Sequence, residues 1–143
     1  MTVRKLVALA VFLIAGLGWY YSRPAGHLTA MSQAGDPAAR AFAERATGRM
    51  IFVQGTVARA LPDDRNGSPH QRFVVRTASG QTLLVAHNID LAARLDGLKA
   101  GDTVSLYGEY VWSDQGGLIH WTHRDPGGQH AAGYIEWQGQ RYQ

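Results

Sequence analysis

From residue 49 onward apolar and polar positions alternate with a period of two, which predicts β-strands rather than helices. We expect strands at 49–61, 70–77, 82–87, 102–113 and 117–123, and a terminal hairpin at 133–143. The turn sequence "ASGQ" joins the second and third of these strands into a hairpin. Ile51, Val53 and Val57 share one face of the first strand, so that face should be buried.

Two short stretches follow a helical pattern instead. Residues 36–48 begin with Asp36 as an N-cap and Pro37 at the first helical position, which predicts one short helix. Residues 88–97 begin with Asn88 as an N-cap and carry apolar residues at helical spacing. We therefore expect a second helix between the third and fourth strands.

This order of elements predicts an all-β fold: a five-stranded OB-type Greek-key barrel, over 49–143, with one helix between strands three and four. In such a barrel the third and fifth strands run parallel, so several strand ends share one pole. Residues far apart in the chain should converge there: Asp63, Asp64, His70, His87, Asn88, Asp90, Asp102, His123 and Asp125.

The N-terminal segment has a different composition. Arg4 and Lys5 precede an uncharged apolar run at 6–21, a pattern that keeps the N-terminus in the cytoplasm and exports the rest. The run is shorter than the roughly 20 residues of a typical spanning helix. It ends on Trp19 and two tyrosines without a small-residue cleavage site, which favours a retained signal anchor over a cleaved signal peptide.

The sequence therefore predicts a signal anchor or signal peptide at 1–21, a linker with a short helix at 22–48, and the barrel domain at 49–143. We expect a single-pass inner-membrane protein, held through residues 6–21, whose C-terminal domain lies in the periplasm or outside the cell.

Composition narrows the function classes. The 143 residues contain no cysteine, so neither a disulfide framework nor a thiolate site is available. The net charge of +3 arises in the N-terminal part, because nine Lys and Arg balance nine Asp and Glu from residue 49 onward. A sequence-independent nucleic-acid binder needs a basic excess on the domain itself, so there is no strong nucleic-acid signal.

The stretch "HWTHRDPGGQH" at 120–130 concentrates histidines at the end of the fifth strand. On a strand His120 and His123 point to opposite faces, so they do not form a chelate by themselves. We expect His120 to be a structural, hydrogen-bonded residue in mid-strand, and His123 to lie where side chains can converge on a site.

The expected catalytic set is His70, Arg72, His87, His123 and Asp125. A hairpin turn centred on Ser79 and Gly80 pairs Arg72 with His87 and places His70 on the same face. Histidine suits proton transfer near neutral pH, and arginine can hold an anionic group with two hydrogen bonds. The leading hypothesis is hydrolysis of a phosphoester or a similar anionic substrate, although no phosphate loop or nucleophile motif is present.

Two alternatives remain open. The first is a divalent-metal site built from two or three of His70, His87, His123 and His130 together with Asp63 or Asp125, so a divalent metal is an unassigned cofactor. The second is a non-catalytic binding module for a periplasmic glycan, peptide or nucleic acid, with an aromatic platform of Tyr107, Tyr110, Trp112 and Trp121. Polar residues at barrel ends also cap strands and helices without any further function.

The blocks "DDRNGSPHQRFVV", "LLVAHNIDLA", "GDTVSLYGEYVW" and "GGLIHWTHRDP" resemble a bacterial family of exported or membrane-anchored domains whose function is unknown. The resemblance covers roughly residues 50–143 and implies membership of that family, but no activity. Arg124 stands where members of the family often have histidine, so the resemblance does not support a ligand pair after Thr122.

Overall fold

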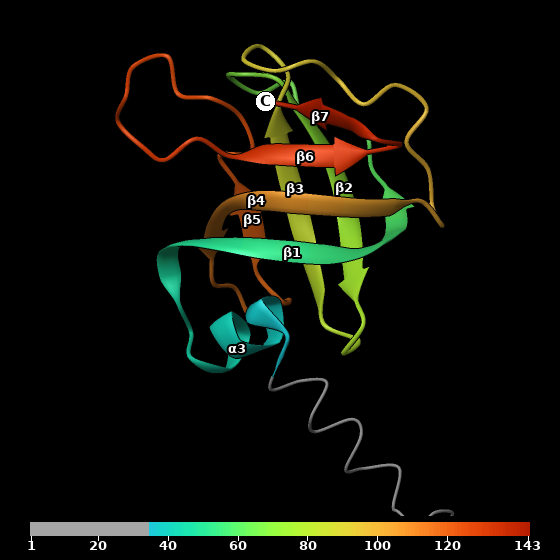
Figure 1. Ribbon diagram of the computed structural model, residues 1–143, viewed down its shortest axis with the longest axis vertical. Helices are drawn as coiled ribbons and strands as arrows, with labels where there is room; N and C mark the ends of the chain where they lie inside the picture. Colours follow the sequence, from blue (N-terminus) through green and yellow to red (C-terminus); the bar gives the residue numbers. More distant parts are fainter. Residues whose placement is uncertain (1–34) are drawn as a thin grey trace, which may run out of the picture. The chain divides into compact units, whose positions relative to one another are not determined.

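Seven strands and one short helix make up the part of the chain that the computed structural model describes, residues 35–143 (Figure 1). The elements are α3 (Pro37–Ala43), β1 (Thr47–Ala60), β2 (His70–Thr77), β3 (Thr82–Asn88), β4 (Thr103–Val111), β5 (Leu118–His120), β6 (Tyr134–Trp137) and β7 (Gln140–Tyr142). The expected anchor at 6–21 lies outside this range. Within residues 35–143 no helix is both long and apolar enough to cross a bilayer.

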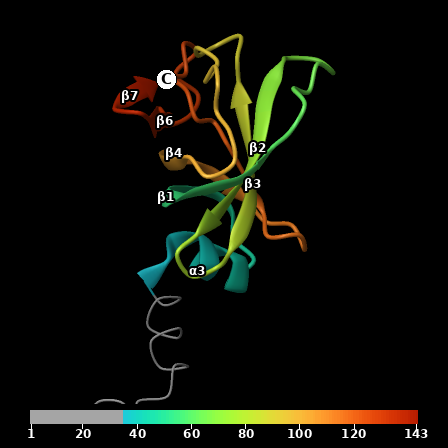
Figure 2. The same cartoon turned by 90° about the vertical axis from the view of Figure 1, so that its right-hand side faces the viewer.

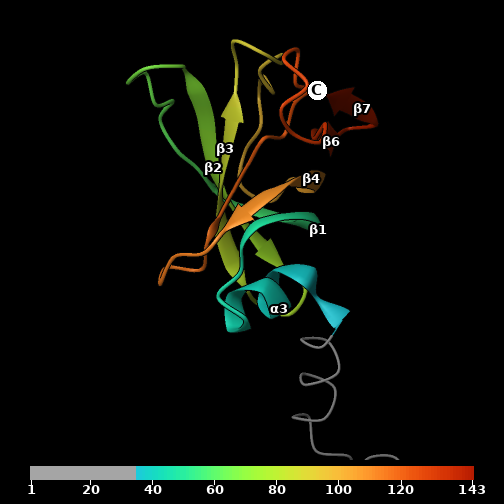
Figure 3. The same cartoon turned by 90° about the vertical axis from the view of Figure 1, so that its left-hand side faces the viewer.

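Five of the strands close into a barrel. The sheet order is β1-β2-β3-β5-β4, and β4 then pairs with β1 from Thr47 to Thr56, which closes the ring. The pairing of β3 with β5 is parallel and the other pairings are antiparallel, as the sequence predicted for the third and fifth strands. Figures 2 and 3 show the β2–β3 hairpin crossing β1 and β4 steeply, with β6 and β7 continuing the sheet beyond β4.

Alternation along the strands fills the barrel with apolar side chains. Ile51, Val53 and Val57 are buried, as expected, and they join a core that includes Phe73, Val75, Leu83, Val85, Leu106, Tyr110, Ile119 and Ile135. Gly55 lies where β1 pairs with both β2 and β4, and a Cβ there would lie 2.5 Å from the carbonyl oxygen of Arg76. A side chain at this position would push the two strands apart.

Helix α3 lies within the range where a helix was predicted, and it contributes to the barrel core. Ala38 and Ala41 are fully buried, while the Asp36 carboxylate caps the helix by accepting from the N–H groups of Ala38 and Ala39. The Ser79 hydroxyl donates a 2.5 Å hydrogen bond to the same carboxylate, which ties α3 to the β2–β3 turn. One end of the barrel is thus covered by α3 (Figure 1).

The predicted helix at 88–97 is wrong, because this segment is a series of turns. Gln71 binds the backbone of Leu95 in both directions: the side-chain amide donates to the carbonyl at 3.0 Å, and the Leu95 N–H donates to the side-chain oxygen at 2.9 Å. Although no regular helix forms, Ala92 and Leu95 of this segment are buried, as is Leu98 directly after it. Contact with Gln71 replaces the hydrogen bonds that a helix would supply locally.

The predicted register of the first hairpin is also wrong, by one residue. His87 pairs with Gln71, and Arg72 pairs with Ala86, because the turn centres on Ser79 rather than between Ser79 and Gly80. A shift of one residue between two paired strands puts residues that were expected to share a face on opposite faces. His87 therefore points into the barrel, and Arg72 lies on the outward face.

The fifth strand is shorter than predicted. It ends at His120, and Trp121 has a φ of 53°, a left-handed conformation that breaks the alternation. Thr122 and His123 are consequently both buried, instead of lying on opposite faces of a strand.

Candidate functional site

Histidines from separate parts of the chain line one hollow at the end of the barrel opposite α3, with a cavity volume of about 410 Å³. His70 begins β2, Asn88 ends β3, and the other polar lining residues follow the end of β5, at the upper end of the domain in Figure 1. We call this the histidine hollow; it is lined by His70, Asn88, Leu91, His120, Trp121, His123, Asp125, Gln129 and His130. The predicted convergence of His70, Asn88, His123 and Asp125 is therefore confirmed.

The loop at 121–133, drawn orange to red in Figure 1, is organised by Asp125. Its carboxylate accepts from the N–H groups of Gly127 and His130, each at 2.8 Å, and from that of Gln129. These hydrogen bonds, above all that from His130, hold the pKa of Asp125 below its usual range. The carboxylate is thus an ionised loop cap that also lines the hollow.

Gly133 holds the C-terminal end of this loop against its N-terminal end. Its N–H donates to the carbonyl of His123 at 2.9 Å, and a Cβ at this position would overlap the carbonyl oxygen of Trp121. Only glycine allows the two backbone segments to approach so closely. The loop is therefore held at both ends, which fixes the side chains that it carries.

Trp121 packs against two of the imidazole rings. Its indole is nearly parallel to His130, at 8° with 4.2 Å between ring centroids, and it also stacks on His120 at 5.0 Å. His123 meets His130 edge-on at 5.3 Å. Aromatic contacts of this kind stabilise ring positions. The imidazoles are consequently held in a fixed arrangement around the indole.

Two of the histidines have an unprotonated ring nitrogen. The Nδ1 atom of His70 lies 2.7 Å from the carbonyl oxygen of Ser68, and Nδ1 of His123 lies 2.7 Å from that of Arg124. Because a carbonyl oxygen only accepts, each Nδ1 carries the proton and donates it. The Nε2 atom of each neutral ring is then an unprotonated acceptor.

The other two histidines pair with carboxylates. His130 donates from Nδ1 to the carbonyl of Ala131 at 2.9 Å, and its Nε2 atom lies 4.0 Å from the Asp125 carboxylate. His120 Nε2 lies 3.1 Å from Glu109, so His120 has the hydrogen bond that the sequence predicted, with a carboxylate as its partner. Each of these rings is oriented by an acidic group.

His87 is not part of the hollow. It is fully buried inside the barrel, where Nε2 donates to the carbonyl of Ala93 at 3.1 Å and Nδ1 accepts from the Thr122 hydroxyl at 2.8 Å. Burial, with a smaller contribution from the nearby His123 and His70, lowers the pKa of His87 to about 4. Both ring nitrogens are occupied, so the structure places this predicted catalytic residue where it contacts only protein.

Arg72, predicted as the anion clamp, also lies outside the hollow. Its Nε donates to the carbonyl of Pro62 at 3.2 Å, and one guanidinium nitrogen is 3.9 Å from the Asp64 carboxylate. The described residues that line the hollow include no lysine or arginine. The charged group in the lining of the hollow is the Asp125 carboxylate. A negative charge suits a neutral or cationic ligand better than an anionic one.

Two further acids expected at this pole, Asp63 and Asp102, have structural partners. Asp63 accepts from Arg94 at 3.1 Å, and the Asp102 carboxylate accepts from Trp137 Nε1 at 3.1 Å and binds Lys99. Hydrogen bonds from these partners hold the pKa of both carboxyls below the usual range. Neither residue lines the hollow.

Potential metal ligands are not grouped together in the described part of the chain. Among residues 35–143 no group of three or more His, Asp or Glu side chains is close enough to hold a metal ion. The divalent-metal site predicted on two or three of His70, His87, His123 and His130 with Asp63 or Asp125 therefore has no support in the described part of the chain.

The aromatic residues named from the sequence do not form one platform. Tyr110 is fully buried and donates to the carbonyl of Gly116, Trp112 stacks on Phe42, and Tyr107 contacts Tyr134. Of the four, Trp121 alone is in the described lining of the hollow.

Sequence reasoning missed three residues at or beside the site: Leu91, Glu109 and Gln129. Leu91 is 45% exposed at the hollow, although it had been assigned to the helix that does not form. Glu109 could have been found from strand register, because it pairs directly with His120. Nothing in the sequence pattern singles out Gln129.

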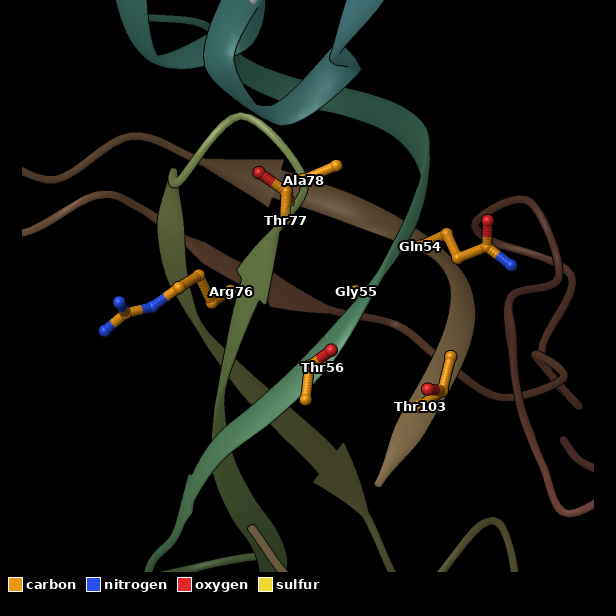
Figure 4. A pocket seen from close by; sticks show the side chains of 7 residues that line it. All are labelled: Gln54, Gly55, Thr56, Arg76, Thr77, Ala78 and Thr103. Atoms are coloured by element: carbon orange, nitrogen blue, oxygen red, sulfur yellow. The ribbon is translucent and has the colours of Figure 1, made fainter. Parts of the chain in front are cut away.

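A second hollow, of about 460 Å³, lies where β1 passes between β2 and β4 (Figure 4). It is lined by Gln54, Gly55, Thr56, Arg76, Thr77, Ala78 and Thr103. The Arg76 side chain extends away from Gln54 and Thr103 in Figure 4, and no histidine or carboxylate is in the described lining. This hollow therefore lacks groups for acid–base chemistry.

Fold and site together define a small closed β-barrel domain with a histidine- and tryptophan-lined hollow at one end. The chain belongs to the family described as "Protein of unknown function (DUF3465)", whose model matches residues 26–143. No curated protein matches the chain significantly. The resemblance to a domain family of unknown function is thus confirmed, whereas its bacterial and exported character remains a prediction.

Proposed function

We propose that this domain is a non-catalytic binding module whose histidine hollow takes a neutral glycan. The observation that supports this most is the chemistry of the lining: imidazole acceptors, side-chain amides and an indole, with an ionised Asp125 and no cation among the described lining residues. Small-ligand sites typically combine an apolar surface with a few placed polar groups. The same lining disfavours the anionic substrate expected from the sequence.

Sugar hydroxyls match the polar groups of the hollow. The Nε2 atoms of His70 and His123 are acceptors, because their Nδ1 atoms donate to backbone carbonyls. The side-chain oxygen of Asn88 accepts from the Asp90 N–H at 2.9 Å, which leaves its amide N–H groups as donors. A hydroxyl group both donates and accepts, so it can bind either kind of partner.

Apolar contacts would come from two residues at the same hollow. Leu91 is exposed there, and Trp121 is partly exposed and held by its stack with His130. Sugar rings carry C–H faces that pack on such surfaces. A nucleic-acid ligand has less support, because phosphate contacts depend on Lys and Arg.

The test is calorimetric titration of the full chain with cello-, malto- and chito-oligosaccharides. We expect one series to bind, and Trp121→Ala and His70→Leu each to weaken it by about tenfold or more, since about 1.4 kcal/mol corresponds to that factor. Arg124→Ala, an exposed change on the same loop outside the lining, is the matched control and should bind normally. Failure of every series to bind, or normal binding by both hollow variants, would reject the glycan assignment.

Hydrolysis of a phosphoester or similar substrate is the second candidate, and one contact favours it. Glu109 holds His120 through Nε2 at 3.1 Å beside the hollow, an arrangement in which a carboxylate orients an imidazole for proton transfer. The test is turnover of p-nitrophenyl phosphate and its diester by the full chain. His120→Gln should abolish that turnover, whereas His87→Gln should retain activity in the folded fraction.

We also propose that the barrel is of the OB type. The supporting observation is the order β1-β2-β3-β5-β4 with closure of β4 on β1 and a parallel β3–β5 pair. A turn segment at 89–102 takes the place of the helix between β3 and β4. Superposition of an experimental structure on OB barrels tests the proposal, and a different strand connection would reject it.

Finally, we propose that residues 6–21 anchor the protein in the inner membrane, with the domain exported. Support comes from Arg4 and Lys5 before the apolar run. A reporter fused after Gln143 should be active only outside the cytoplasm and should sediment with membranes. A soluble exported reporter would instead indicate cleavage, and a cytoplasmic one would reject export.

A further inference from the structure

The outward face of the barrel wall carries an apolar row across β2, β3 and β5, with Arg59 of β1 beside it. Arg59 pairs with Val74, Val74 with Leu84, and Leu84 with Leu118, so these side chains are cross-strand neighbours on one face. Val74, Leu84 and Leu118 are only partly buried. A groove of about 340 Å³ lies over this row, and we call it the β2–β3 groove; it is lined by Arg59, Leu61, Val74, Thr82, Leu83, Leu84, Ser113, Gln115, Gly117 and Leu118.

Positive charge flanks this groove. Arg72, Val74 and Arg76 alternate along β2 and therefore share the outward face with the apolar row. Arg59 and Arg76 are exposed and make no ion pair with any residue from 35 to 143, and Arg72 reaches Asp64 only at 3.9 Å. No acidic residue is in the described lining. An otherwise charge-balanced domain thus presents a locally basic, apolar groove.

We propose that the β2–β3 groove docks an extended peptide segment whose aliphatic side chains are flanked by acidic side chains on the same face. In an extended peptide alternate side chains point the same way, so aliphatic ones can enter the groove of Val74, Leu84 and Leu118. Carboxylates that flank these aliphatic side chains on the same face of the peptide can then bind the guanidinium groups of Arg59 and Arg76, which match a carboxylate with two parallel hydrogen bonds. This site is separate from the histidine hollow and does not depend on the glycan proposal.

The side chains in the groove favour a peptide over a single-stranded nucleic acid, the other extended anionic ligand. Base recognition without sequence preference relies on aromatic stacking platforms. The described groove lining contains aliphatic and small polar residues and no aromatic ring. Leucine- or valine-sized side chains fit such a surface, whereas planar bases have nothing to stack on.

The test is fluorescence anisotropy of labelled peptides with the purified full chain. The probe is a capped leucine–glutamate peptide with leucine at two alternate positions, glutamate two residues before and two residues after them, and serine at the positions between. The comparison ligands are the same peptide with lysine in place of glutamate, the same peptide with serine in place of leucine, and oligothymidylate. We expect the leucine–glutamate peptide to bind at least about tenfold more tightly than any comparison ligand, and more weakly at high salt because exposed charges are screened.

Charge reversal then locates the site. The double variant Arg59→Glu, Arg76→Glu should weaken binding of the leucine–glutamate peptide by about tenfold or more, because both positions are exposed and the fold does not depend on them. Arg124→Glu is the matched control: it reverses an exposed arginine outside the groove that makes no ion pair with residues 35–143, and it should leave the affinity unchanged. Normal binding by the double variant, an equal loss in the control, or tighter binding of oligothymidylate would overturn the proposal.

Discussion

Histidines in the described part of this protein occupy two contrasting environments. His87, with Gln71 and Thr122, forms an interior polar cluster in which all three residues are buried and hydrogen-bonded to protein. The histidine hollow instead presents His70, His120 and His130 at a partly exposed surface. The same residue type therefore serves the fold in one place and is available to a ligand in the other.

The difference lies in what the ring nitrogens contact. Both nitrogens of His87 are occupied, by the Ala93 carbonyl and the Thr122 hydroxyl. His70 uses only Nδ1, at the Ser68 carbonyl, and keeps Nε2 free for other partners. A histidine whose hydrogen bonds are all satisfied internally is a structural residue, and this criterion distinguishes the two environments better than sequence position does.

Truncating His87, the interior histidine, should cause the largest loss in the free energy of unfolding. His87→Ala removes a fully buried ring and leaves the Ala93 carbonyl without its donor. We expect the free energy of unfolding to fall by about 3 kcal/mol, from the cavity and the unpaired polar group together. Urea denaturation measures this loss. A decrease under about 0.5 kcal/mol, typical of surface changes, would mean that His87 is not the interior residue described here.

The pH dependence of stability tests the burial of His87 without creating a cavity in the core. The pKa of His87 is lowered from 6.5 to about 4, so between these values the unfolded chain binds a proton that the folded chain does not. The free energy of unfolding should therefore fall as pH decreases from about 6.5 to 4, by up to about 3 kcal/mol from this group. Urea melts of wild type and His87→Gln across that window isolate the contribution, because carboxyl groups titrate in both. Parallel curves for the two proteins would contradict the prediction.

The strands of the barrel could be predicted because alternation encodes which face is buried. Ile51, Val53 and Val57 alternate and are all buried, and the parallel β3–β5 pair followed from the element order. The segment at 88–97 could not be predicted from local pattern, because its backbone is bound by Gln71, a residue remote in sequence.

The candidate site was predictable only in part. The grouping of His70, His123 and Asp125 followed from strand ends meeting at one pole, and these residues do line one hollow. The shared face predicted for His87 and Arg72 was wrong, because a shift of one residue in the hairpin register places the two side chains on opposite faces. The loop from Trp121 depends on a positive φ and on the Asp125 cap, which strand periodicity does not encode.

Trp121→Ala tests the hollow at an intermediate magnitude. The substitution removes the ring that packs against His120 and His130 but leaves the barrel core intact. We expect a loss of about 1 kcal/mol in the free energy of unfolding, in the range of an aromatic pair, together with loss of ligand binding at the hollow. Urea denaturation and oligosaccharide titration on the same variant give both values. A loss as large as that of His87→Ala would show that the hollow is part of the core.

His70→Ala should have the smallest effect on stability and sharpens the comparison most directly, since it changes the same residue type as His87→Ala. The ring of His70 is partly exposed, and its Nδ1 donates only to the local Ser68 carbonyl, which water can solvate after truncation. We expect the free energy of unfolding to change by less than about 0.5 kcal/mol. If the hollow binds a ligand, however, loss of the Nε2 acceptor should weaken that ligand measurably while the melting curve stays close to wild type. Thermal melts of the two alanine variants, recorded side by side, decide the matter: equal destabilisation would mean that the two environments are not distinct, and a stable His70→Ala protein with impaired binding would show that they are.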